Sequence, residues 1–286
     1  MNAALFTPKT LSELFAHIAG CAGEIHFVAG ATDWIPRHAK GLSPDSAVID
    51  LSSLEILRGI KKYPGHIAIG SMETMTALSE NELLRAEAAC LAEAAQKLGS
   101  WQIRNRATVG GNIANASPAA DTPVALAALG AAVILQSADG RRELPVSQMA
   151  AAPGKSILRR GELITEIHVP IDEKRISAFG KIGSRTEVSI ARLNMAACVT
   201  FGESKKAAAS IFVGALGANP LRAEAAEKIL NDGGAADAFC DALSAFAADA
   251  IPGRASLPYK RRAIRALGED ILKDLQAKAQ KRGMSL

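Results

Sequence analysis

Aromatic residues are scarce in this sequence, at 4% of its 286 residues, while the wider hydrophobic class reaches 49%. Base-stacking surfaces need aromatic side chains, so we do not expect a nucleic acid as a partner. Positive charge is not concentrated either, because the formal net charge is only +4 and acidic residues follow the densest basic stretch, residues 260–265. A solvated helix face explains that stretch more simply than a polyanion site, which stays open as the alternative.

Long apolar runs and paired cysteines are also missing. No run approaches the roughly 20 residues of a membrane helix, so no membrane association is expected. The first residues lack the positively charged start and apolar stretch of a secretory leader. The four cysteines, at positions 21, 90, 198 and 240, form no CxxC pair, which argues against zinc or iron–sulfur ligation by this chain alone. We therefore expect a cytoplasmic protein with free thiols.

Common catalytic and nucleotide-binding patterns are absent as well. Neither GxxxxGK[ST] nor GxGxxG occurs. The five histidines are scattered along the chain, at His17, His26, His38, His66 and His168. This spacing suggests neither a metal site nor a Ser-His-Asp arrangement, so we expect no metal and no catalytic acid or base.

The hydrophobic pattern predicts helices and strands in more than one domain, since domains average roughly 100–200 residues. A capping box at residues 10–13 opens a helix, and strands at 25–29 and 47–51 complete a βαβ-like start. Asp139 and Gly140 predict a hairpin turn. The remaining predicted strands are 66–71, 132–136, 142–145, 163–169, 196–201 and 209–214, and the remaining helices are 82–98, 124–129, 222–231, 235–250 and 260–280.

Two stretches do not fit a regular element. Residues 103–118 are so rich in Gly, Asn and Ser that we expect either an ordered loop or a functional segment there. Residues 170–178 are polar and break the hydrophobic pattern, which makes a domain boundary plausible there.

Glycine-containing segments occur at residues 28–33, VAGATD, and 108–112, TVGGN. Glycine lets the backbone approach a phosphate closely, and successive N–H groups can surround an anion. Nearby Thr, Ser and Asn side chains add hydroxyl and amide hydrogen bonds. Either segment alone is better explained as a turn. When both are considered together, a dinucleotide site and simple turns are about equally well supported.

Residues 103–130 closely resemble the second flavin motif of the FAD-binding subunits of molybdenum hydroxylases, IRNxATxGGNIxxxSPxxDxxPxLLALxA. That family includes the xanthine dehydrogenase flavin domain and the medium subunits of carbon monoxide dehydrogenase. Residues 28–33 resemble its first motif, VAGGTD, with Ala31 in place of the second glycine. If that position needs a positive φ, the alanine costs about 1 kcal/mol.

The resemblance extends over essentially the whole chain. Residues 161–170 resemble the family's GELIxxIxxP strand. Residues 181–196 resemble its KxxxRxxxDIAxVNxA segment, with Ser189 where the family usually has Asp. Residues 256–262, SLPYKRR, resemble the C-terminal SxxYRR signature.

The resemblance implies an α+β fold in three parts. Residues 1–57 and 58–172 would form a two-part FAD-binding domain of the vanillyl-alcohol-oxidase-like type. Residues 173–286 would form a C-terminal α+β domain with a small antiparallel sheet and helices. The implied cofactor is FAD, and the implied binding residues are Ala29, Gly30, Ala31, Thr32, Asp33, Thr108, Gly110, Gly111, Asn112, Ser117, Asp121, Leu163, Ile164 and Lys181.

The resemblance also implies roles within this set. The glycine segments would line the pyrophosphate, and Ser117 and Asp121 would reach the ribityl or adenosine hydroxyls. Leu163 or Ile164 would pack near the isoalloxazine, and Lys181 would lie at its polar edge. Each has a simpler alternative: Asp121 as a helix cap, the two aliphatic residues as core, and Lys181 as an exposed strand charge.

The function implied is that of one oxidoreductase subunit in a heteromeric enzyme. Electrons would leave a substrate at a large molybdopterin subunit, cross a [2Fe–2S] subunit and reach the FAD here. They would then pass to an external acceptor such as NAD or a quinone. Two alternatives stay open, namely a self-contained FAD oxidoreductase of the same fold and a non-catalytic module that has lost its flavin.

Overall fold

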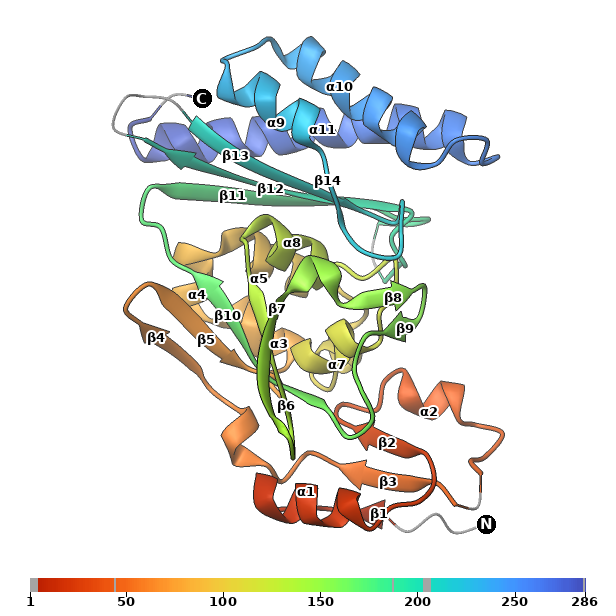
Figure 1. Cartoon of the computed structure of the whole chain (residues 1–286). Helices are drawn as coiled ribbons and strands as arrows, with labels where there is room; N and C mark the ends of the chain where they lie inside the picture. The colour runs from red at the N-terminus through yellow and green to blue at the C-terminus, as the bar shows by residue number, and fades with distance from the viewer. Residues whose placement is uncertain (1–4, 44, 187, 203–206, 285) are drawn as a thin grey trace.

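The computed structural model describes residues 5–43, 45–186, 188–202, 207–284 and 286. Residues 1–4, which belong to the stretch where no secretory leader is expected, lie outside the described residues. Three of the four sheets in this part of the chain follow one another along the long axis of the molecule (Figure 1). Among the described residues, no helix combines the length and apolar character that a membrane crossing requires.

The N-terminal unit is a parallel three-stranded sheet in the order β1 (Leu5–Phe6), β3 (Ala47–Asp50), β2 (Ile25–Val28). The helices α1 (Leu11–Ala19) and α2 (Trp34–Arg37) connect its strands. The hydroxyl of Thr10 accepts the Glu13 amide at 3.1 Å, as the capping box predicts. The Glu13 carboxylate accepts the Lys9 amide at 2.8 Å, so the helix start is fixed from both sides.

The middle unit is an antiparallel five-stranded sheet covered by helices. Its order is β4 (Ile60–Tyr63), β5 (His66–Gly70), β10 (Leu163–Pro170), β6 (Ala132–Ser137), β7 (Gly140–Pro145), and the β6–β7 pairing confirms the predicted hairpin. The helices are α3 (Met75–Glu80), α4 (Glu82–Glu87), α5 (Ala89–Gln96), α6 (Trp101–Arg104), α7 (Val109–Ala114) and α8 (Thr122–Ala128). Short elements η1 (Glu55–Leu57), η2 (Val146–Gln148), β8 (Ala150–Ala152) and β9 (Lys155–Ser156) complete it.

The C-terminal unit is an antiparallel sheet in sequence order, β11 (Arg175–Ile182), β12 (Leu193–Phe201), β13 (Ala207–Gly214) and β14 (Leu221–Arg222). Helices α9 (Glu224–Asn231), α10 (Ala236–Ala250) and α11 (Leu257–Lys281) cover its outer face (Figure 1). Its inner face packs on α5 and α8 of the middle unit. The sheet therefore lies between two helical layers, which explains its nearly continuous apolar strands.

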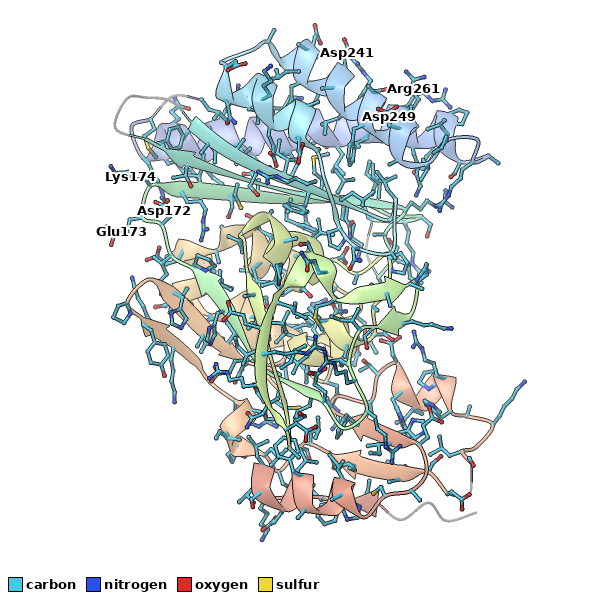
Figure 2. The ribbon with its side chains drawn as sticks, viewed as in Figure 1. Asp172, Glu173, Lys174, Asp241, Asp249 and Arg261 are labelled. Carbon is cyan, nitrogen blue, oxygen red and sulfur yellow. The ribbon has the colours of Figure 1, made fainter. Side chains whose placement is uncertain are left out.

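The long basic stretch of α11 lies on this outer layer. Figure 2 shows Arg261 together with Asp241 and Asp249 of α10 among the side chains of the outer helices. The Arg265 guanidinium pairs with the Asp241 carboxylate, and Arg261 donates to the Ser244 hydroxyl at 3.1 Å. These contacts fit the helix-face interpretation of the basic residues.

The structure differs from the sequence-based expectations at three places that matter for the site and its surroundings. The helix expected over 82–98 is divided at Ala88, whose φ of −141° and ψ of 47° interrupt it. Residues 103–118 are not an irregular loop throughout, because they include the end of α6 and all of α7. The polar stretch 170–178 contains the start of β11. Figure 2 shows Asp172, Glu173 and Lys174 at the exposed turn that leads into this strand.

Candidate functional site

The two glycine segments lie against each other. A β-carbon on Gly30 would lie only 1.9 Å from the Arg106 carbonyl oxygen, and one on Gly111 would lie 3.9 Å from the Ala29 β-carbon. Residues 29–33 leave the end of β2, while residues 108–112 begin α7. The absence of a side chain at Gly30 is therefore what lets these two segments meet.

The first segment presents free backbone donors. Ala31 has a φ of 63°, so this position does use the left-handed conformation that the family's glycine suggests. Its carbonyl oxygen accepts the Ile35 amide at 3.1 Å. Within the described part of the chain, the amides of Gly30, Ala31 and Thr32 donate to no protein acceptor. These amides remain available to an anionic ligand.

A cleft of about 270 Å³ lies beside the two segments. The predicted residues that line it are Ala29, Gly30, Ala31, Thr32, Asp33, Thr108, Gly111 and Asn112. Gly110 does not line it. Its amide donates to the Ser71 carbonyl oxygen at 2.8 Å, and a β-carbon there would lie 2.6 Å from the Ser71 β-carbon. Gly110 therefore packs α7 against the chain after β5.

A larger cleft, of about 730 Å³, lies beside residues 98–104, a segment that also borders the smaller cleft. Gly99, Trp101 and Arg104 line the larger cleft, whereas Leu98 and Ile103 line the smaller one. The side chains of the larger cleft include four cations, Lys97, Arg104, Lys181 and Arg185. Among its described lining residues no carboxylate occurs, so this cleft favours ligands that carry or acquire negative charge.

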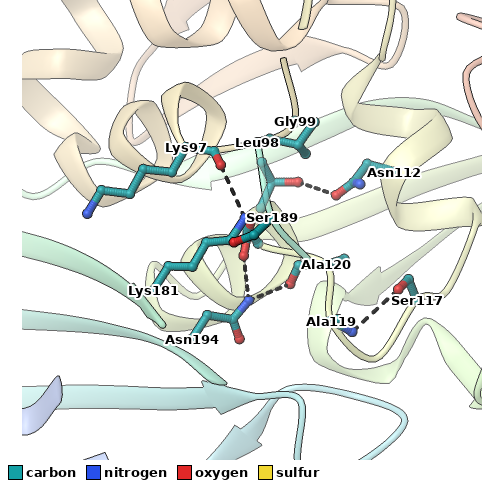
Figure 3. Close-up of polar contacts among 12 residues, drawn as sticks. Lys97, Leu98, Gly99, Asn112, Ser117, Ala119, Ala120, Lys181, Ser189 and Asn194 are labelled. Atoms are coloured by element: carbon teal, nitrogen blue, oxygen red, sulfur yellow. Dashed lines mark hydrogen bonds and ion pairs between the residues drawn. The ribbon is translucent and has the colours of Figure 1, made fainter. Parts of the chain in front are cut away.

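Lys181 is held in place by a buried carboxylate (Figure 3). Its ammonium donates to Asp121 Oδ2 at 2.6 Å and to the Lys97 carbonyl oxygen at 3.1 Å. Asn194 donates to Asp121 Oδ1 at 2.7 Å and to the Ala120 carbonyl oxygen at 3.2 Å. The Lys181 side chain is only 9% exposed, so it is not an exposed strand charge.

Burial raises the pKa of Asp121 above its ordinary value, although the Lys181 ammonium and the Asn194 amide act in the opposite direction. The residue is 3% exposed, and its side chain makes no capping bond to α8. The capping alternative for Asp121 is therefore wrong. What the carboxylate does in this structure is hold the lysine.

Ser117, Leu163 and Ile164 lie outside both clefts. The Ser117 hydroxyl accepts the Ala119 amide at 3.4 Å. Leu163 packs with the core residues of the N-terminal unit, and Ile164 packs in the core of the middle unit. Both aliphatic residues occupy core positions, which is the simpler of their two interpretations.

Several site residues carry no motif signal. Trp34 and Arg37 of α2 and His38, which caps its C-terminal end, line the smaller cleft. They carry no signal in the sequence because α2 has only four residues and no helical periodicity. Asn194 could have been found, since it stands at the asparagine of the VNxA pattern. In the described part of the chain, no three His, Cys, Asp or Glu side chains gather to hold a metal ion.

Two family models match most of the chain. The model described as the FAD binding domain in molybdopterin dehydrogenase matches residues 1–172. The model described as the CO dehydrogenase flavoprotein C-terminal domain matches residues 178–275.

Individual relatives show the same likeness. The 6-hydroxypseudooxynicotine dehydrogenase complex subunit alpha of Paenarthrobacter nicotinovorans is 33% identical over 75% of this chain and 73% of its own length. The carbon monoxide dehydrogenase medium chain of Afipia carboxidovorans is 27% identical over 88% and 89%. Among solved structures, reconstituted CO dehydrogenase from Oligotropha carboxidovorans contains a chain that superposes with a TM-score of 0.84. That match has 25% identity and covers 96% of this chain and 97% of the other.

Proposed function

The chain belongs to the FAD-binding medium subunits of the molybdenum hydroxylase family, and from this we propose that it passes electrons from an iron–sulfur partner chain through FAD to an external acceptor. FAD is its cofactor, and the chain is an oxidoreductase subunit with an α+β fold. When bound, FAD supplies the electron-carrying chemistry, whereas the protein supplies binding, orientation and electrostatics.

The meeting of the two glycine segments is the observation that carries this proposal. The free amides of Gly30, Ala31 and Thr32 face no protein acceptor and suit a pyrophosphate. Gly111 and Asn112 line the same cleft, and a side chain at Gly111 would extend into the neighbourhood of Ala29. We assign this cleft to the pyrophosphate of FAD.

The larger, cationic cleft suits the isoalloxazine. Its Lys181 ammonium is fixed by Asp121, so a positive charge stands ready at a defined point. A fixed cation stabilises negative charge that develops beside it, without the cost of reorienting water. Asp121 and Asn194 thus act as positioning residues for the lysine.

The names of the relatives support a heteromeric enzyme. They are called medium chains or complex subunits, and this chain has no cysteine pattern for its own iron–sulfur cluster. We therefore propose a [2Fe–2S] subunit and a large molybdopterin subunit as partners, with NAD or a quinone as acceptor. Affinity purification of the tagged chain from its own cells, followed by iron and molybdenum analysis, should recover both metals with the chain.

Cofactor retention tests the proposed site directly. The purified full-length chain should elute from gel filtration with visible flavin absorption after FAD is added. We predict that Gly111→Asp abolishes this retention, because a carboxylate would face the pyrophosphate. Gly111→Asn is the matched control, since it adds nearly the same volume without charge and should retain more FAD. Stoichiometric FAD in Gly111→Asp would refute the assignment.

A further inference from the structure

One wall of the smaller cleft is aromatic. Trp34, Arg37 and His38, all from α2 or its C-terminal end, line the cleft together with the glycine segments. This wall contributes two aromatic side chains and one guanidinium to a site whose other polar groups include backbone amides, hydroxyls, Asn side chains and the Asp33 carboxylate. None of these three residues was expected from the family motifs.

The rings of this wall hold one another in place. The Trp34 and His38 rings stack with centroids 4.8 Å apart and an interplanar angle of 30°. His26 of β2 meets His38 edge-on at 4.9 Å. His38 Nδ1 lies 2.8 Å from the Trp34 carbonyl oxygen, which fixes the histidine ring on the helix. The stack is therefore ordered in advance, so little side-chain freedom is lost when a flat ligand binds.

His26, which contacts this wall from β2, carries little charge of its own. Burial lowers the pKa of His26, and the neighbouring His38 acts in the same direction while Glu24 opposes it. His26 is thus neutral at pH 7. An aromatic surface beside an anion-binding backbone matches a flat heterocycle joined to a phosphate.

We propose that Trp34 and His38 form the platform for the adenine of FAD, with Arg37 adding positive charge on the pyrophosphate side. This inference rests on the proposed function and deepens it. A cleft of about 270 Å³ is smaller than a typical drug-sized pocket, about 300–1,000 Å³, and so holds only part of a dinucleotide. The larger cationic cleft takes the isoalloxazine, which leaves the adenosine half for the aromatic wall.

A comparison of FAD with FMN tests the platform, because FMN lacks the adenosine half. Loss of one base–aromatic stack weakens binding by roughly 5- to 150-fold. Trp34→Ala should therefore raise the Kd of the full-length chain for FAD by that factor and leave the Kd for FMN unchanged. Trp34→Phe should restore most of the FAD affinity. Ile35→Ala is the matched control, since Ile35 is exposed on the same helix and does not line the cleft.

Fluorescence gives a second readout that needs no flavin. Trp34 and Trp101 are the only tryptophans, so a Trp101→Phe chain reports Trp34 alone. ADP should change this emission and should compete with FAD. If Trp34→Ala does not fold by circular dichroism, His38→Ala replaces it in the FAD and FMN comparison.

The possible results distinguish a failure of the adenine platform from a failure of the proposed function. Equal weakening of FAD and FMN by Trp34→Ala would overturn the adenine assignment while leaving the flavin site in place. Unchanged FAD affinity in Trp34→Ala, or no response of Trp34 emission to ADP, would overturn it as well. If the wild-type chain bound neither flavin, both the proposed function and the platform would fall.

Discussion

Ala31 adopts a backbone conformation that alanine usually avoids. Its φ of 63° brings the β-carbon towards the following carbonyl oxygen, which costs about 1–2 kcal/mol. The loop keeps this conformation because the chain must turn from β2 into α2, where the Ala31 carbonyl oxygen accepts the Ile35 amide. The same turn leaves the free amides at the cleft. The strain therefore lies where the site needs its geometry.

We predict that Ala31→Gly stabilises the chain. Glycine removes the left-handed strain but gains more freedom in the unfolded state, so the free energy of unfolding should rise by about 0.5–1 kcal/mol. Urea denaturation measures this change. Ala29→Gly is the control, because its φ is not positive and the same exchange there should lower stability. Similar losses in both variants would show that the alanine carries no strain.

The residue types of the site were predictable from the sequence, but their partners were not. The resemblance assigned Asp121 and Lys181 to two separate contacts with the cofactor. The structure joins them by a bond between residues 60 positions apart. No local pattern encodes such a pair, because it depends on how β11 lies over the start of α8. The direct contacts of these residues with FAD remain a prediction.

At the scale of elements, α7 forms a helix although its composition predicts a loop. Two glycines in six residues disfavour a helix. The Thr108 hydroxyl offsets part of this cost by accepting the Gly111 amide at 3.2 Å. Packing on Ser71 then requires a glycine at position 110. Tertiary contact, which a single sequence does not display, decides the conformation here.

This explanation predicts that Gly110→Ala destabilises the chain, although alanine is the better helix former. The added β-carbon would lie 2.6 Å from the Ser71 β-carbon, so α7 must shift. We expect the free energy of unfolding to fall by about 1–3 kcal/mol, the usual range for an overpacked contact. Gly20→Ala is the control, since its φ is −86° and its nearest neighbour would be 3.5 Å away. Gly110→Ala as stable as wild type in urea would contradict this explanation.

Strand β11 was missed for a related reason. It begins with Arg175, whose charge predicts a polar boundary in the sequence. In the structure this residue is buried. Its guanidinium donates to the carbonyl oxygens of Pro170 and Leu129, at 2.5 and 3.3 Å. Those acceptors come from the end of β10 and from the residue that follows α8. A charged residue at a strand end can therefore lie buried at a junction between units. In the sequence such a residue looks the same as an exposed residue at a polar boundary.

At the scale of the whole molecule, the C-terminal unit completes the site that the first two units begin. The side-chain amide of Asn219 accepts the Ala150 amide and donates to the Ala150 carbonyl oxygen, both at 2.8 Å. Lys278 of α11 pairs with Glu93 of α5. The Lys181–Asp121 pair belongs to the same junction. The division of the chain at residues 57 and 172 remains a prediction. It is supported by three clusters of buried hydrophobic residues, each of which lies mainly at one of the three larger sheets.

The Lys181–Asp121 pair makes this junction sensitive to pH once the lysine is removed. Burial already raises the pKa of Asp121, and Lys181 opposes that rise. In Lys181→Met the pKa must rise further, so the folded chain retains a proton that the unfolded chain has lost. Because the folded state then binds more protons than the unfolded state, its stability falls as pH increases above the ordinary carboxyl range. The loss continues until pH exceeds the raised folded-state pKa.

We therefore predict that Lys181→Met is more destabilised, relative to wild type, at pH 7.5 than at pH 5. The extra loss should be about 1 kcal/mol or more, since one unit of pKa shift corresponds to roughly 1.4 kcal/mol. Urea denaturation at the two pH values measures it. The double variant Asp121→Asn, Lys181→Met lacks the carboxylate and should show no such extra loss. A deficit for Lys181→Met that is equal at both pH values would mean that removing the lysine leaves the proton binding of Asp121 unchanged. The carboxylate would then not be electrostatically coupled to Lys181 as its fixed counter-ion in the cationic cleft.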